Sequence, residues 1–448
     1  MNVFHLKRGL DIPLGGAPRQ EISPGPSVRR VALLGDDYVD LKPRFHVQIG
    51  DRVALGQQLF EDKKNPGVRF TSPGSGTVVD IQRGAKRKFE AIIIELDGDE
   101  ERLFPIPADY GPEGLSGQDI RDLLIRSGLW TALRTRPYDK VAPVAGRPNS
   151  LFVTAMDTRP LAADPALIIA EHRDDFILGL QMVQRLAPTT YLCTNGNPEI
   201  PGTDMGGITH AEFHGPHPAG LPSTHIHFLD PVGPKKTAWF IGYPDVIAIG
   251  HLFRTSRIMT ERVVSLAGPA MADQRLIRIR LGADLADICP DEAKNPDIRL
   301  LSGSVLNGRM YSKANSFFGR YHHQICALCE GDGRGLFSWM MPGRDRYSTK
   351  RLFFSSFMAK RGFAMTTAAW GGRRVIFPLG VYEEVMPLDF VITSLLKSLA
   401  TDDLEKAADL GTLELVEEDL ALCSFVDPGK NDFGPMLRAM LTRIDREC

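Results

Sequence analysis

The sequence predicts a multidomain chain that combines α/β and α+β architecture. Its 448 residues exceed what one hydrophobic core usually supports. Residues 150–194 alternate strand, helix and strand, which indicates a parallel sheet covered by helices. Residues 41–82 place apolar positions between closely spaced glycine turns, as short barrel strands do, and the carboxyl-terminal stretch has a helical period. We therefore expect four domains, with bounds 1–103, 104–257, 258–330 and 331–448.

Composition narrows the function classes. The chain is 43% hydrophobic and 24% charged, with a net charge of −2, so no overall field attracts nucleic acid. The most apolar stretch, residues 237–253, is too short for a membrane span and contains Pro244 and Asp245. We expect no signal peptide at the start of the chain, and we therefore expect the six cysteines to be reduced thiols. We expect a cytoplasmic protein that reaches a membrane only through partners.

The first domain resembles the biotinyl/lipoyl barrel. Val47, Val53 and Leu59 are expected to point inward from short strands, with glycine turns between them. In lipoyl carriers a hairpin lysine is modified, which makes Lys63 and Lys64 candidates. Neither lies at the carriers' usual distance before the Ser-Pro corner of the barrel, so we predict a plain exposed hairpin and keep a carrier protein as an alternative.

The second domain is predicted to be Rossmann-like. A helix from residue 118 should end at Ser127-Gly128, because glycine commonly terminates helices. The other expected elements are strands at 150–157, 189–194, 208–213 and 237–242, a helical stretch at 164–188 and a helix at 244–253. The region contains neither G-x-G-x-x-G nor a Walker A motif, so no dinucleotide or P-loop signature accompanies the predicted fold.

The loop 127–140 is the candidate ligand-facing surface. It resembles the glycine-rich flavin loop of the flavin subunits of proton-pumping NADH dehydrogenases and of the Rnf complex, where glycines let backbone N–H groups approach phosphate. Trp130 stands where such a cradle needs no side chain, while Arg134, Arg136 and Lys140 keep positive charge nearby. We predict a loop that faces a quinone or a partner subunit, without bound flavin.

Histidines and cysteines supply the candidate metal ligands. Five histidines cluster between residues 210 and 227, and we expect them to form turns or to pack on a strand, with a zinc site as the alternative; they are His210, His214, His217, His225 and His227. Cys326 and Cys329 lie three apart in a strand-like run, so they should point to opposite faces; we expect two core thiols.

The third and fourth domains also resemble redox subunits that have lost their ligands. Residues 261–288 and 301–310 resemble the soluble-ligand-binding (SLBB) β-grasp module of respiratory flavin/iron–sulfur subunits. Residues 420–434 resemble the end of an iron–sulfur motif, but Asp427 stands where the last cysteine would be, and Cys423 alone cannot hold a cluster. A β-hairpin and helices at 387–400 and 433–447 are expected to complete the chain.

Together these blocks resemble the A subunits of sodium-translocating NADH:quinone reductases (the Nqr complex), which are related to the C subunits of the Rnf complex. The residues that carry the resemblance are 7–18, 41–82, 215–232, 268–285, 302–309, 319–328 and 426–441.

The resemblance implies a peripheral subunit on the cytoplasmic face of the bacterial inner membrane. Its partners would be the other subunits, above all the quinone-side membrane subunit. The resemblance also allows contact with ubiquinone. The complex uses NADH, flavins, iron centres and ubiquinone to export Na⁺, but the family motif assigns this chain no cofactor, metal or catalytic residue. A self-sufficient flavin-dependent NADH dehydrogenase is the other alternative, and it would contain stoichiometric flavin.

Overall fold

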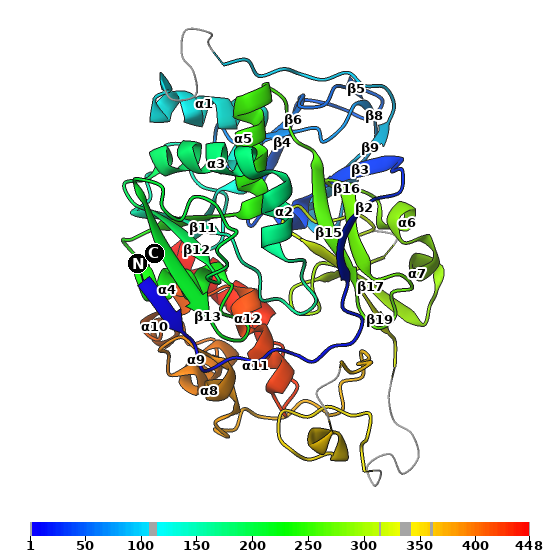
Figure 1. Cartoon of the computed structure of the whole chain (residues 1–448), viewed down its shortest axis with the longest axis vertical. Coiled ribbons are helices and arrows are strands. Elements are labelled where there is room, and N and C mark those ends of the chain that lie inside the picture. The colour runs from blue at the N-terminus through cyan, green and yellow to red at the C-terminus, as the bar shows by residue number, and fades with distance from the viewer. Residues whose placement is uncertain (1, 107–113, 313–314, 332–341, 359–361, 448) are drawn as a thin grey trace.

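The computed structural model describes residues 2–447 except 107–113, 313–314, 332–341 and 359–361 (Figure 1). It confirms the predicted multidomain α/β and α+β class: a barrel, an α/β domain, a β-grasp sheet and a helical carboxyl-terminal region. None of the described helices is both long enough and apolar enough to span a membrane.

The barrel consists of two sheets that enclose a shared core. Val53 and Leu59 are buried as predicted, and Val47 is half-buried beside them. Gly50 and Gly56 turn with positive φ, which glycine adopts without steric cost. One sheet has the order β3 (Arg30–Leu34), β9 (Phe89–Leu96), β8 (Gly76–Arg83), β5 (Arg52–Val53), and the other has the order β4 (Pro43–Phe45), β6 (Gln58–Asp62), β7 (Arg69–Thr71).

The α/β domain contains a six-stranded sheet in which the edge strand β10 is antiparallel to its neighbour and the other strands pair in parallel. Leu151 and Val153 face the core under the helices α3 and α5, whereas Phe152 faces the helix α4 on the other side. The strand order is β1 (Asn2–His5), β13 (Ile208–His214), β12 (Thr190–Thr194), β11 (Ser150–Thr154), β14 (Ala238–Gly242), β10 (Arg134–Arg136).

Five helices cover this sheet, and the sequence predicted most of them. The stretch expected at 164–188 is two helices rather than one, because the backbone leaves the helical region at His172. Gly250 lets α3 and α5 cross closely, since a Cβ there would lie 1.7 Å from the carbonyl oxygen of Asp175. The helices are α1 (Gly117–Ser127), α2 (Pro165–Glu171), α3 (Arg173–Val183), α4 (Pro222–Leu229) and α5 (Tyr243–Thr255).

The β-grasp sheet mixes parallel and antiparallel pairs, and the short helices α6 (Leu285–Ile288) and α7 (Pro290–Lys294) pack beside it. Its strand order is β18 (Arg309–Met310), β17 (Ile298–Ser302), β19 (Gln324–Cys329), β15 (Glu261–Ala267), β16 (Arg275–Arg280), β2 (Arg19–Pro24).

The amino-terminal strands do not pair within the barrel. Strand β1 extends the α/β sheet beside β13, and β2 extends the β-grasp sheet beside β16. The first 24 residues therefore tie two other domains together before the chain enters the barrel (Figure 1). The domain bounds drawn from the sequence stay a prediction.

The carboxyl-terminal region is a small helical domain. Helix α12 (Phe433–Glu447) begins and ends where the sequence predicted, with Leu437, Met440, Leu441 and Ile444 buried. Helix α9 (Ile392–Ala400) starts later than expected. Helices α8 (Val381–Val385), α10 (Leu404–Asp409) and α11 (Ala421–Val426) complete the core. The predicted β-hairpin falls mainly on residues 332–341, outside the described residues.

Candidate functional site at the domain junction

The loop that follows α1 packs against the barrel. Gly128 ends α1 in the left-handed conformation, and a Cβ on it would lie 2.4 Å from Oγ1 of Thr71. The Thr71 hydroxyl donates to the carbonyl oxygen of Ser127 at 2.9 Å. The one glycine that survives from the flavin-loop pattern is therefore needed for contact between domains, because only a residue without Cβ fits there.

Trp130 lies inside the protein. It belongs to the short helix η4 (Leu129–Ala132), is 0% exposed, and meets Trp239 edge-on with 5.5 Å between ring centroids. Its Nε1–H donates to the carbonyl oxygen of Ala142 at 2.7 Å. Burial of a tryptophan with its N–H satisfied is a large packing contribution. The side chain expected to face a ligand instead packs between Arg121 of α1 and Trp239 of β14.

The two arginines of the loop share one buried carboxylate. Arg134 and Arg136 both form ion pairs with Asp139, and Nε of Arg136 also donates to the hydroxyl of Ser223 at 3.1 Å. Burial raises the pKa of Asp139, but the two guanidinium groups lower it more, so the carboxylate stays ionised. Arg134 also lies over the ring of Tyr321, 4.3 Å from its centroid. Both cations therefore have a carboxylate partner within the chain.

Lys140 lies closer to the surface. Its ammonium contacts Asp445 of α12 at 2.5 Å and Asp40 of the barrel at 3.8 Å. It lines a groove of about 350 Å³ between the barrel hairpin, the loop and the last helix, together with Tyr138 and Lys64. Of the four predicted site residues, Lys140 and Arg134 keep partial exposure, whereas Trp130 and Arg136 are interior.

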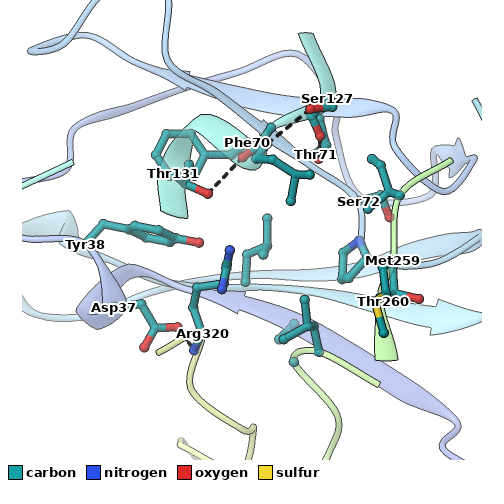
Figure 2. A pocket seen from close by; sticks show the side chains of 18 of the residues that line it. Asp37, Tyr38, Phe70, Thr71, Ser72, Ser127, Thr131, Met259, Thr260 and Arg320 are labelled. Atoms are coloured by element: carbon teal, nitrogen blue, oxygen red, sulfur yellow. Dashed lines mark hydrogen bonds between the residues drawn. The ribbon is translucent and has the colours of Figure 1, made fainter. Parts of the chain in front are cut away.

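A small cavity marks the point where the barrel, the α1 loop and the β-grasp sheet meet (Figure 2). Its volume is about 60 Å³, which is room for a few waters and is far below the ~300–1,000 Å³ of pockets that hold drug-sized ligands. A flavin ring does not fit this space. The labelled lining residues are Asp37, Tyr38, Phe70, Thr71, Ser72, Ser127, Thr131, Met259, Thr260 and Arg320.

A buried ion triad supports the floor of this cavity. Asp245, near the start of α5, contacts Arg262 of β15 at 2.5 Å and Arg320 at 2.9 Å, and all three side chains are less than a tenth exposed. Burial alone would raise the pKa of Asp245, but the two guanidinium groups lower it to about 2. No local sequence pattern indicates this triad, since its members are far apart in the chain.

A second buried network occupies the crevice between β11 and β14, where ligands bind in doubly wound folds. Arg159 pairs with Asp157 at 3.1 Å and with Glu418 of the carboxyl-terminal domain at 2.5 Å. His323 lies 3.7 Å from Asp157, and His217 is buried nearby with its pKa lowered to about 4 by burial. The chain's own charged side chains thus fill the usual nucleotide position.

The five clustered histidines have separate partners. His225 and His227 lie on α4, not on a strand as predicted, so residues two apart point to different sides. His225 is buried and its Nε2 contacts the carbonyl oxygen of Ala219 at 3.0 Å, whereas His227 contacts Glu414 at 2.9 Å. The other three contact Thr194, Glu212 and Thr158. Within the part of the chain that the structure describes, no group of His, Cys, Asp or Glu could hold a metal ion.

The positions considered for cysteine ligands have structural roles in the described chain. Asp427, where an iron–sulfur motif would end in cysteine, is buried and accepts hydrogen bonds from the hydroxyl of Tyr382 at 2.8 Å and the backbone N–H of Asn431 at 2.7 Å. Cys326 and Cys329 do point to opposite faces, but only Cys326 is buried, so the expectation of two core thiols was wrong for Cys329.

The fold and the junction together define a class of multidomain scaffold, in which a barrel, an α/β domain and a β-grasp sheet meet around buried ion networks of the chain's own side chains. Three family models match: the NqrA N-terminal barrel-sandwich hybrid domain at residues 4–97, the NqrA second alpha/beta domain at 115–258, and the NQRA C-terminal domain at 263–313.

Curated relatives match from end to end. The A subunit of the Na⁺-translocating NADH-quinone reductase of Rhodopirellula baltica is 49% identical over 450 residues, covering 100% of this chain and 99% of the relative. The A subunits of the same enzyme from Pseudomonas aeruginosa and Yersinia pestis are 50% and 47% identical over 446 residues, covering 99% of this chain and 100% of each relative. The chain belongs to the NqrA family, the A subunits of Na⁺-translocating NADH-quinone reductases, and is thus part of an enzyme complex.

Proposed function

We propose that this chain is the peripheral subunit on the cytoplasmic side of a sodium-pumping NADH:ubiquinone reductase of the bacterial inner membrane. It supports electron transfer to ubiquinone, coupled to Na⁺ export, without a redox cofactor of its own. The observation that carries the proposal is the end-to-end match to NqrA relatives. Its partners are the other subunits of the complex, above all the quinone-side membrane subunit.

The geometry of the junction supports a cofactor-free role. Close approach of Gly128 to Thr71, the small cavity at the junction and the ion network between β11 and β14 leave little room for a flavin or a nucleotide. Asp427 is engaged in hydrogen bonds where a cluster thiolate would be needed. Because side chains of the chain itself occupy these positions, we infer that the subunit positions its partners and does not carry electrons.

The groove beside Lys140 is the candidate surface for a quinone or a partner subunit. Its volume of about 350 Å³ lies within the range of ligand pockets, and Tyr138 and Phe70 give it aromatic walls. Lys140 lies at its rim, and its ammonium, which has three N–H groups and pairs with Asp445, can also donate a hydrogen bond to a quinone oxygen. Trp130 and Arg136 would then act indirectly by holding the loop in place.

Purification of the chain with its membrane partners tests the role in the complex. We expect co-purification, restoration of ubiquinone reductase activity on adding the chain to a depleted complex, and no stoichiometric flavin in the isolated chain. Stoichiometric flavin absorbance would instead support the NADH dehydrogenase alternative. An intact mass above that of the sequence, mapped to Lys63 or Lys64, would support the carrier alternative.

The groove is tested separately with Lys140→Ala in the assembled complex. We expect a raised apparent KM for ubiquinone or weaker assembly, because the cation at the rim is lost. Lys88→Ala is the matched control, since Lys88 is an exposed barrel lysine that also pairs with an aspartate. Unchanged turnover, inhibitor response and assembly in Lys140→Ala would reject the groove while leaving the role in the complex intact.

A further inference from the structure

One end of the molecule exposes an unusual number of apolar side chains. Between β19 and α8 the described residues 342–358 and 362–380 contain little regular structure apart from η7 (Phe354–Phe357), and they lie at the lower end of the view (Figure 1). Half of the large apolar side chains that are exposed in the described chain lie here. We call this surface the end face: Leu352, Phe354, Phe357, Trp370, Val375, Phe377 and Leu379.

The exposed fraction of these side chains is high, and the residues fall in two short stretches of the chain, 352–357 and 370–379. Phe357 is 76% exposed and Val375 is 70% exposed. Single exposed apolar residues are normal on any protein, but a contiguous group indicates an interaction site. A groove of about 560 Å³, lined by Phe354 and residues 342–346, opens beside them. The end face therefore combines exposed apolar side chains with a neighbouring groove.

Internal contacts hold the two parts of the end face together. The guanidinium of Arg346 lies 4.7 Å from the ring centroid of Trp370 and 6.0 Å from that of Phe353. The backbone N–H of Phe354 donates to the carbonyl oxygen of Pro342 at 2.8 Å. The surface is thus a defined arrangement rather than a set of unrelated side chains.

The end face is basic, although the whole chain has a net charge of −2. The segments that carry it, residues 342–358 and 362–380, include six basic side chains and one acidic side chain. Lys350 pairs with Glu384 at 2.5 Å, while Arg351, Arg373 and Arg374 are exposed. A complementary partner must therefore carry carboxylates or phosphates as well as apolar groups.

The backbone hydrogen bonding of residues 372–378 favours a protein partner over a lipid surface as the occupant of the end face. Arg374 donates its N–H to the carbonyl oxygen of Gly429, and its own carbonyl oxygen accepts from the Asn431 side chain. The other backbone N–H groups of residues 372–378 have no hydrogen-bond partner among the described residues. Irregular backbone of this kind is not stable in hydrocarbon, whereas an extended peptide can pair with it.

We propose that the end face binds an extended segment of a partner protein that carries aliphatic side chains and carboxylates. Backbone groups of residues 372–378 pair with that segment, Val375 and Phe377 contact its apolar side chains, and Arg373 and Arg374 meet its carboxylates. The inference rests on the proposed function, in which this chain works in a multisubunit complex, and it assigns the docking surface within that complex.

Site-specific cross-linking tests the proposal. A benzophenone side chain at Phe377 of the full chain, irradiated in the purified complex, should form an adduct with another subunit, within a segment containing Asp or Glu. The same probe at Ile49, an apolar barrel residue that is 59% exposed, is the control and should give no such adduct. A lipid adduct, a cross-link to a second copy of this chain, or no adduct from position 377 would overturn the proposal.

Charge reversal gives an independent readout. Arg373→Glu with Arg374→Glu should weaken retention of the chain by the complex at least about tenfold, because repulsion replaces attraction. Lys86→Glu with Arg87→Glu is the matched control, an adjacent exposed basic pair on the barrel that should leave retention unchanged. If wild type is retained and both double variants are retained equally, the assignment of the end face as the docking surface is wrong. If wild type itself is not retained, the proposed function is wrong.

Discussion

The domain junction and the end face use the same residue types with opposite results. At the junction, Arg262 and Arg320 neutralise Asp245, and Trp130 is fully buried with its N–H satisfied. At the end face, arginines and Trp370 stay exposed. Buried charges must be paired, since an unpaired one costs several kcal/mol, whereas exposed charges and apolar groups are available to a partner. The buried, paired residues of the junction therefore stabilise the fold, whereas the exposed residues of the end face are available for binding.

Tryptophan substitutions are expected to show the largest contrast. Trp130→Ala removes a 0% exposed side chain and its hydrogen bond to Ala142, so the free energy of unfolding should fall by about 3–5 kcal/mol. Trp370→Ala, at 55% exposure, should change it by less than about 0.5 kcal/mol. Urea unfolding followed by circular dichroism measures both. Equal losses would mean that Trp370 is packed as tightly as Trp130.

Removal of a junction carboxylate should have the next largest effect. Asp245→Asn leaves Arg262 and Arg320 buried without a counter-charge, which should cost about 3 kcal/mol of unfolding free energy. Asp402→Asn breaks the pair with Arg443 on the surface, and solvent screening should limit that loss to about 0–1 kcal/mol. Chemical denaturation of the two variants compares them directly. A small loss for Asp245→Asn would show that water reaches the triad.

The pH dependence of stability should identify the same carboxylate. Because the pKa of Asp245 is lowered to about 2 in the folded chain, its stabilising contribution is fully present above the ordinary carboxyl pKa, about 3.9. It should be lost as the pH falls from about 4 through about 2. The difference in unfolding free energy between wild type and Asp245→Asn should therefore shrink over that range. A difference that does not change with pH would contradict the lowered pKa.

Phe377→Ser should have the smallest effect on the isolated chain. Phe377 is 51% exposed, so the unfolding free energy should change by no more than about 0.5 kcal/mol. The same variant should weaken binding to the partner subunits, because the proposed apolar contact is lost. A large loss of stability would place Phe377 in the core of the isolated chain and remove it from the end face.

Local patterns predicted the separate domains well. Glycine turns and alternating apolar residues located the barrel, and the period of α12 gave its bounds. Local patterns failed where tertiary contacts determine the secondary structure. His225 and His227 were expected to form a turn or to pack on a strand, yet residues 222–229 form α4, with a proline in its first turn and Ile226 buried under the sheet. The candidate loop 127–140 stays a prediction as a ligand- or partner-facing surface, and the burial of Trp130 and Arg136 within it was not visible in the sequence.

The sequence by itself determined the order of the domains and the family, because these depend on local spacing and side-chain chemistry. Only the tertiary structure decided which charges meet. Asp245 and Arg320 are far apart in the chain, as are Arg159 and Glu418, and each pair forms only when separate domains pack together. Contacts of that kind arise from the packing of surfaces, and no local pattern records them.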